Sequence, residues 1–119
     1  MDLIPRLKIM LDGGVLSKEN YDHVLKIIRY IDECYGVVLT EENSSAFTTH
    51  LCIALERATR GETVNMMDDD VYEDVTSQPD YKRACQISAD IMRMYPAIPE
   101  TETRYLNLHL TVMLESMAE

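Results

Sequence analysis

Residues 100–114 read ETETRYLNLHLTVML, and this stretch carries most of the fold prediction. Its apolar residues recur at the spacing of one face of an α-helix. Followed a little past the stretch, they are Leu106, Leu110, Met113, Leu114 and Met117. Pro96 and Pro99 mark a tight connection just before it, because proline is poorly tolerated inside a helix. The carboxyl end of the chain is therefore predicted to be a long helix that begins near Glu100.

Two more long helices are predicted upstream from their caps and their periodicity. Ser17 is a suitable N-cap for a helix that Gly36 would end. The inward positions of this helix are Tyr21, Val24, Leu25, Ile28, Ile31 and Tyr35. Thr40 is a suitable N-cap for the next helix, which should run to about Arg60 and end at Gly61. Its inward positions are Phe47, Leu51, Ala54, Leu55 and Ala58.

The other segments show weaker signals. Residues 6–11 are predicted to form one short turn, stopped by the glycine pair that follows. Residues 62–79 contain three consecutive aspartates and are predicted to be a loop with a short helix near 68–75. An amphipathic helix resumes over 80–95, and no strand-like alternation of any length occurs.

These segments predict an all-α fold, a compact bundle of four main helices plus one or two short helices. With 119 residues, of which 46% are hydrophobic, the chain has the size of one domain that buries a core without disulfides. We expect residues 1–16 to form an N-terminal short helix or turn and residues 17–117 to form a single helical domain.

The charge of the chain restricts its partners. Eleven basic residues stand against 21 acidic ones, for a net charge of −10. This balance argues against direct nucleic-acid binding and against an anionic membrane surface. The excess is concentrated in residues 61–119, where four basic residues face twelve acidic ones. An acidic surface can serve solubility alone or can attract a basic protein partner.

The cysteines and the N-terminus point to a cytoplasmic protein. Cys34, Cys52 and Cys85 are odd in number and widely spaced, which fits a reducing compartment better than a disulfide framework. Each falls where an apolar residue would sit, so we expect each to be buried. No signal peptide and no apolar run of membrane-spanning length is present.

Few residues could carry chemistry. The chain has no phosphate-binding glycine loop, no nucleophile elbow and no zinc-type spacing. The aspartate triplet would diverge on a helix and is interpreted as a solvated corner, and His50 with Cys52 lacks a second pair of metal ligands. We therefore expect no cofactor and no metal. His23 is interpreted as a surface residue, which leaves His50 and His109, each at the edge of an apolar helical stripe.

Residues 49–65, THLCIALERATRGETVN, taken together with residues 99–110, resemble the PTS regulation domain (PRD) family. One signature helix of that family begins with a His-apolar pair and continues through Glu-Arg to a glycine. The other carries Pro-Glu, an acidic residue and then Tyr-Leu-x-Leu-His-apolar. The resemblance covers roughly residues 17–117. One departure is Thr49, where many members have aspartate.

The resemblance implies a compact helical bundle, often dimeric, in bacterial regulation of sugar operons. It implies that His50 and His109 accept phosphoryl groups from the phosphocarrier HPr or an enzyme II B component. Arg57 lies seven residues after His50 on the same helix face, where it can meet the added negative charge. Because the chain has one copy of the domain and no output domain, its output would pass through an unidentified protein partner.

The sequence thus predicts a free-standing, non-enzymatic PRD that regulates transcription or sugar uptake through a protein partner. The alternative is a phosphorylation-independent interaction protein of the same fold, which would act by dimerising or by masking another protein. An enzyme using either histidine as a general base is disfavoured, because no nucleophile or oxyanion donor can be named beside it.

Overall fold

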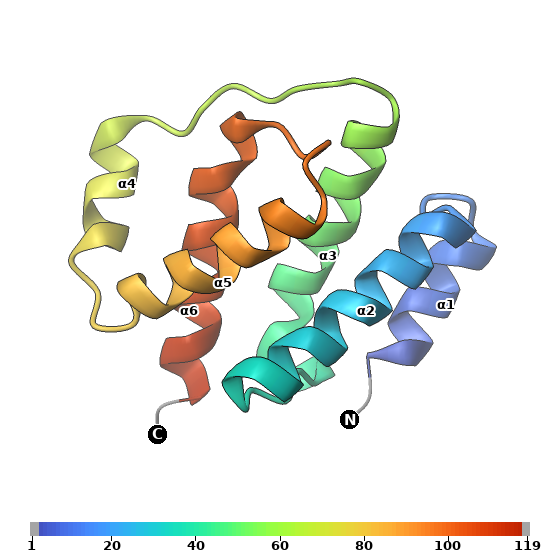
Figure 1. Ribbon diagram of the computed structural model, residues 1–119, viewed down its shortest axis with the longest axis horizontal. Coiled ribbons are helices and arrows are strands. Elements are labelled where there is room, and N and C mark those ends of the chain that lie inside the picture. The colour runs from blue at the N-terminus through green and yellow to red at the C-terminus, as the bar shows by residue number, and fades with distance from the viewer. Residues whose placement is uncertain (1–2, 118–119) are drawn as a thin grey trace. The chain divides into compact units, whose positions relative to one another are not determined.

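The computed structural model describes residues 3–117, and within that range all regular structure is helical (Figure 1). The elements are α1 (Ile4–Asp12), α2 (Lys18–Tyr35), α3 (Glu41–Thr59), α4 (Asp69–Thr76), α5 (Tyr81–Met94), the 3-10 turn η1 (Glu100–Glu102) and α6 (Thr103–Met117). The predicted all-α class is confirmed, with four long and two short α-helices. The chain divides into two compact units, an N-terminal unit that ends at Glu56 and a C-terminal unit that begins at Arg57.

The predicted helix boundaries of the N-terminal unit hold because the caps work locally. Ser17 Oγ accepts a hydrogen bond from the Asn20 backbone N–H at 3.2 Å, and Gly36 ends α2 with a φ of 67°. Thr40 Oγ1 accepts from the Asn43 N–H at 3.3 Å. α3 then kinks at Ser44, whose φ of −140° lies outside the helical range.

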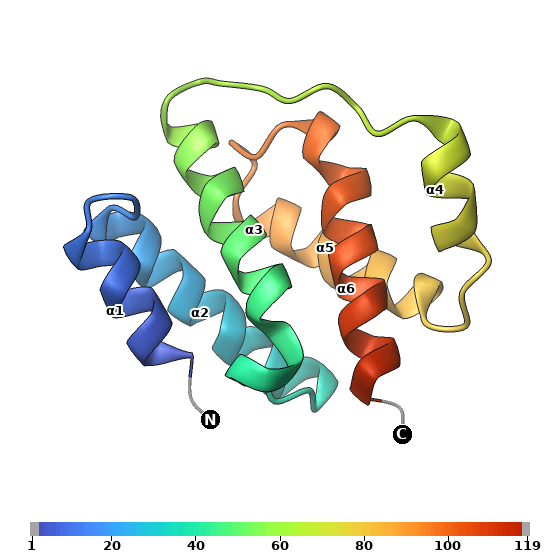
Figure 2. The same ribbon diagram turned by 180° about the vertical axis from the view of Figure 1, so that it is seen from behind.

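The first helix is longer than the short turn predicted for residues 6–11. α1 begins at Ile4, because Pro5 lies in its first turn, where a missing N–H costs nothing. Leu3 and Leu7 are both buried and anchor the helix within its unit. In Figures 1 and 2, α1 runs alongside α2.

The core of the N-terminal unit lies between α2 and α3, on a stripe slightly rotated from the predicted one. Leu25, Ile28 and Tyr35 are only half-buried, whereas Ile27 is fully buried. The fully buried side chains of these two helices include Val24, Ile27, Ile31, Leu51 and Ala54. The predicted inward face of α3 is confirmed, except that Ala58 is half-buried.

The C-terminal unit is organised around α6. α5 crosses α6 and α4 lies along it, as both ribbon views show (Figures 1 and 2). Its buried apolar side chains are Met67, Val75, Ala84, Ile87, Ile91, Ile98, Leu106, Leu110, Met113 and Leu114. The connection from α3 to α4 ends where predicted, because α4 spans Asp69–Thr76.

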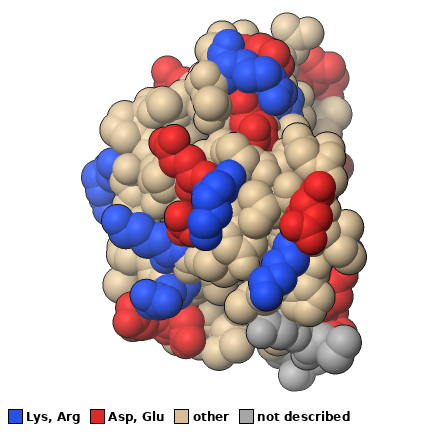
Figure 3. Space-filling model, turned by 90° about the vertical axis from the view of Figure 1, so that its right-hand side faces the viewer, with Lys and Arg blue, Asp and Glu red and all other residues tan. Residues whose placement is uncertain are grey.

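The prediction that all three cysteines are buried holds fully only for Cys52. Cys34 is exposed, Cys52 is buried and Cys85 is half-buried. Cys34 lies in the last turn of α2, at the end of the helix face that carries Ile27 and Ile31. On the face drawn in Figure 3, basic and acidic side chains are interspersed. Among the helices of residues 3–117, none is long and apolar enough to cross a membrane.

Candidate functional site

The two histidines singled out by the sequence fall in different units. His50 lies in α3 of the N-terminal unit and His109 lies in α6 of the C-terminal unit. Both are half-buried, between a fully buried leucine on one side and more exposed positions on the other. Solvent does not reach the Nε2 atom of His50. A group that reacts with this nitrogen therefore requires the imidazole to rotate.

An ion pair joins α1 to α3 on the side of α3 that carries Thr49. Arg6 Nε of α1 donates to both carboxylate oxygens of Glu41, at 2.9 and 2.8 Å, and Arg6 Nη2 also contacts Glu41 Oε1. Arg6 Nη1 donates to Thr49 Oγ1 at 3.4 Å, directly beside His50 in the chain. The hydrogen bond from Arg6 lowers the pKa of Glu41, and the same bond raises the pKa of Arg6. The residue before His50 thus faces a cation.

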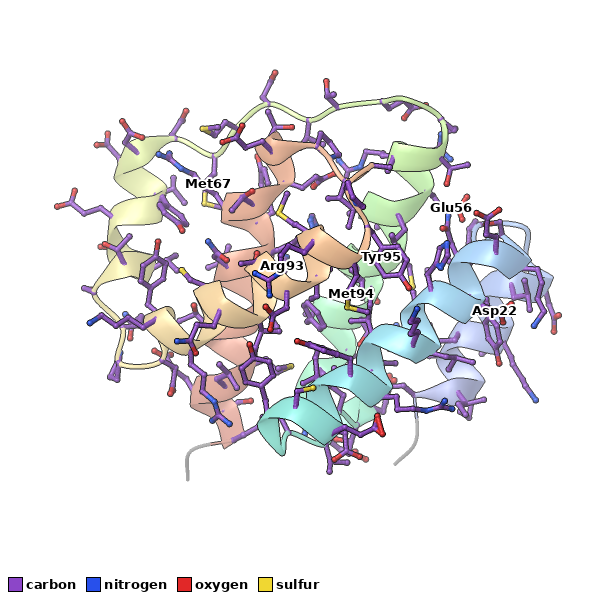
Figure 4. All side chains as sticks on the ribbon, viewed as in Figure 1. Asp22, Glu56, Met67, Arg93, Met94 and Tyr95 are labelled. Carbon is purple, nitrogen blue, oxygen red and sulfur yellow. The ribbon has the colours of Figure 1, made fainter. Side chains whose placement is uncertain are left out.

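A second carboxylate ties α3 to the start of α2. Glu56 Oε2 accepts hydrogen bonds from the Ser17 N–H at 2.8 Å, from Ser17 Oγ at 2.9 Å and from Asn20 Nδ2 at 2.7 Å. Figure 4 labels Glu56 where α3 passes the N-terminal end of α2. A carboxylate there also complements the helix dipole of α2. Cys52 lies one turn earlier, and burial raises the pKa of its thiol to about 12, so the thiol is inert.

His109 belongs to a helix held by neutral polar groups. Asn107 Nδ2 donates to the Tyr72 hydroxyl at 2.9 Å, and the Tyr72 and Tyr81 hydroxyls are 2.6 Å apart. The Tyr105 hydroxyl donates to the Asn65 carbonyl at 2.9 Å. These bonds join α6 to α4 and to the connection that precedes α4, and they join α4 to α5.

A single arginine reinforces the same side of α6. Arg104 Nη1 donates to the Met67 carbonyl and to Asp69 Oδ1, each at 2.7 Å, and its guanidinium lies 4.8 Å from the centre of the Tyr72 ring. Met67 is labelled in Figure 4 in the segment that leads into α4. Asp69 and both neighbouring aspartates are exposed, as predicted for a solvated acidic corner.

Arg57 contacts a buried carboxylate in the C-terminal unit. Its Nε lies 3.5 Å from Glu102 Oε2, and the side chains of Arg57 and Glu102 are 20% and 0% exposed. Burial raises the pKa of Glu102, and the nearby charge of Arg57 opposes that shift. Glu102 precedes His109 by seven residues, two turns along η1 and α6. Arg57 is therefore a cation that already has an acidic partner beside the helix that bears His109.

His23 and the metal-binding alternatives add little chemistry. His23 lies on α2, with Nε2 3.6 Å from Glu19 Oε1 and a side chain that is 31% exposed, so it is less exposed than predicted. Within residues 3–117, no three histidine, cysteine or acidic side chains come together in a way that could hold a metal ion.

Sequence reasoning missed four of the residues around these histidines. Arg6 and Glu41 gave no sequence signal for these contacts, because their partners lie far away in the chain, whereas Glu56 is the glutamate of the Glu-Arg pair in the motif that begins at His50. Glu102 did give one, since it is the acidic residue between Pro-Glu and Tyr in the motif that ends at His109.

The sequence of the chain was compared with protein families and with known proteins. The sequence model of the PRD domain matches residues 25–112, which include His50, Arg57, Glu102 and His109. The chain is also 22% identical over 91 residues to the uncharacterized protein YhfY of Escherichia coli (strain K12), a match that covers 76% of this chain and 75% of YhfY. No solved structure matches the chain. α1, with Arg6, precedes the matched residues.

Proposed function

The chain belongs to the PRD domain family, and on that premise we propose that it is a regulatory module of the phosphotransferase system in which His50 and His109 accept phosphoryl groups. Membership links it to regulation by that system in general. The identity of the two acceptors, the donor and the output belong to the proposal. HPr or an enzyme II B component would be the donor, and a second protein would read the result.

The observation that carries the proposal is the setting shared by the two histidines. Each is half-buried, and each is followed three residues later by an exposed β-branched side chain on the same helix face. Ile53 follows His50 and is 43% exposed, and Val112 follows His109 and is 55% exposed. An acceptor beside an exposed apolar residue suits a protein donor, which can cover the apolar surface while it approaches the imidazole.

Phosphorylation would act through charge. A phosphoryl group adds about −1.5 to −2 charges at neutral pH. In a chain with a net charge of −10, this charge favours cationic neighbours and disfavours acidic ones, and so can change the affinity for a partner or the geometry of a homodimer. We propose that Arg57 is the cation that this added charge attracts. Its guanidinium lies against the buried Glu102, so the phosphoryl group would compete with that carboxylate for Arg57.

The test is phosphoryl transfer in a reconstituted system. The purified chain is mixed with phosphoenolpyruvate, enzyme I and HPr, with and without enzyme II B components, and intact mass is read at neutral or alkaline pH. We expect a gain of one or two phosphoryl groups. His50→Ala and His109→Ala should each lose one of them, and His23→Ala is the matched control because it removes a half-buried helical histidine outside both motifs.

Absence of phosphoryl transfer would contradict the proposal. A chain that takes no phosphoryl group from any of these donors, while an established PRD in the same mixture does, would contradict the acceptor role of both histidines. Equal loss of transfer in all three variants would instead indicate damage to the fold.

The covered Nε2 atom of His50 supports one alternative, a phosphorylation-independent interaction protein of the same fold. This alternative predicts that His50→Ala lowers the stability of the chain without changing any phosphoryl uptake. Thermal unfolding of the variants used in the transfer experiment separates the two cases.

The remaining features of the proposal follow from the family and the charge. We propose a cytoplasmic, non-enzymatic protein without direct nucleic-acid or membrane binding, in which residues 17–117 form the regulatory domain and a homodimer is one possible state. Sedimentation with and without phosphorylation tests the last point.

A further inference from the structure

The N-terminal unit contains a groove of about 310 Å³ that is formed by α1, α2 and the connection from α2 to α3. Leu25 and Ile28 of α2 line it, and both are only half-buried, although helical spacing predicts them to be inward. Ile4 of α1 and Val38 and Leu39 of the connection complete its apolar lining. Val38 is 57% exposed. The unit therefore leaves aliphatic surface uncovered, and a ligand that buries this surface gains free energy.

Two opposite charges lie on the same face of α2 as the aliphatic lining. Arg29 and Asp32 follow Leu25 by four and seven residues, spacings that place side chains on one face of a helix. Both residues line the groove and both are exposed. Among the residues that the structure describes, neither side chain takes part in an ion pair or a hydrogen bond. The guanidinium and the carboxylate can therefore both bind a ligand.

The size of the groove and its two charges select one class of ligand. Its volume lies at the lower end of the range for small-molecule sites, about 300–1,000 Å³. A carboxylate matches the planar guanidinium of Arg29, and an ammonium group matches the carboxylate of Asp32. Three residues of helix rise only about 4.5 Å, so the two charges of the ligand must lie close together. A ligand with one charge alone would leave either Arg29 or Asp32 unmatched.

We propose that this groove binds a free α-amino acid with a branched aliphatic side chain, such as leucine. Arg29 holds the α-carboxylate, Asp32 holds the α-ammonium group, and the ligand side chain covers Val38 and the half-buried aliphatic lining. This inference goes beyond the proposed function, because it requires neither histidine to accept a phosphoryl group. The amino acid would be an input to the chain that is separate from phosphorylation, since a ligand stabilises the state that binds it.

The experiment is a titration of the full chain with L-leucine, followed by the NMR chemical shifts of the backbone amides. Three further probes each lack one feature of leucine: glycine lacks the side chain, isocaproate lacks the ammonium group and isoamylamine lacks the carboxylate. The variants are Arg29→Gln, Asp32→Asn and Val38→Ser. Lys26→Gln and Glu33→Gln are the matched controls, because each removes one exposed charge from α2 outside the groove.

We expect L-leucine to shift the amide signals of the groove with a Kd of about 1 mM, because an open groove covers only part of a small ligand. Each of the other probes should bind the parent at least about tenfold more weakly. Arg29→Gln and Asp32→Asn should weaken L-leucine by a similar factor and Val38→Ser by less, while both controls keep the parent Kd. Asp32→Asn should bind isocaproate no more weakly than the parent does, because the carboxylate that repels this probe is gone.

Absence of shifts at the groove with L-leucine would overturn the site, and equal binding of L-leucine and isocaproate to the parent would overturn the ligand class. If Arg29→Gln does not fold, the isocaproate titration of Asp32→Asn decides the role of the charges. Groove signals that move with protein concentration and ignore L-leucine would assign the groove to a second copy and overturn the proposal. The phosphoryl transfer assay judges the proposed function separately, because no histidine lines the groove.

Discussion

The surroundings of His50 and of His109 are built from different interactions. In the unit that bears His50, carboxylates bind across elements: Glu41 pairs with Arg6, and Glu56 accepts three hydrogen bonds from the start of α2. In the unit that bears His109, an amide and two hydroxyls join α6 to α4 and α4 to α5, beside the charged pairs Arg57–Glu102 and Arg104–Asp69. Charged contacts respond to pH and to added charge, whereas neutral buried contacts do not. We therefore expect pH and added charge to act on the carboxylate pairs of both units and to leave the tyrosine hydroxyl cluster unchanged.

The largest stability effect is expected from Glu56→Ala. The substitution leaves the buried Asn20 amide and the first turn of α2 without their acceptor. Hydrogen bonds to charged groups are strong, so we expect a loss of about 2–4 kcal/mol in the free energy of unfolding, measured by urea denaturation. The control is Glu19→Ala, which removes an exposed carboxylate from the first turn of α2. An equal loss of stability in both variants would contradict this role of Glu56.

In the C-terminal unit, the largest stability effect is expected from Tyr72→Phe. It removes the hydroxyl that links Asn107 and Tyr81, and we expect a loss of about 1–2 kcal/mol. Tyr105→Phe removes a hydroxyl bond to the Asn65 carbonyl that is open to solvent, and should cost less. If Tyr105→Phe costs more than Tyr72→Phe, the neutral cluster does not hold α4 as described. The effect of Tyr72→Phe should be insensitive to salt.

A third test compares how Glu41 and Glu102 make the free energy of unfolding depend on pH, because their pKa values are shifted in opposite directions. The bond from Arg6 lowers the pKa of Glu41, so this pair stabilises the fold above the ordinary value of 4.5, and the contribution is lost as pH falls through the lowered pKa. Burial raises the pKa of Glu102, so the folded chain holds that proton more tightly and stability declines as pH rises from 4.5 to the raised value.

Glutamine at each position should remove one of these two slopes. We expect Glu41→Gln to flatten the loss of stability on the acid side and Glu102→Gln to flatten the decline above 4.5. Urea denaturation of both variants and the parent across this pH range measures the slopes. Slopes that are unchanged, or exchanged between the variants, would refute the assignment.

The smallest stability effect is expected at the two exposed apolar residues. Ile53→Ser and Val112→Ser should change the free energy of unfolding by no more than about 0.5 kcal/mol. In the transfer assay each should slow phosphorylation of the histidine on its own helix and leave the other histidine unaffected. Unchanged rates at both histidines would show that donors do not use this surface.

Local features of the chain were predictable from its sequence. The caps at Ser17 and Thr40 and the glycine at the end of α2 act within a few residues, and so their effects are visible in the sequence. α1 begins two residues before the short turn predicted over 6–11, and Pro5 in its first turn is compatible with a helix start. The exposure of Cys34 was missed, because it lies in the last turn of α2 on the face of Ile27 and Ile31, where helical spacing alone predicts burial.

The sequence by itself determined the helical class, the order of the long helices, the ends of α2 and α3, membership in the PRD family and the two candidate histidines, because helical periodicity, caps and motifs are local properties. Only the tertiary structure decided which charges meet: Arg6 with Glu41 beside Thr49, Glu56 at the start of α2, and Arg57 with the buried Glu102. The physical reason is distance along the chain. An ion pair forms where packing brings two helices together, and the spacing of residues within one helix carries no record of that meeting.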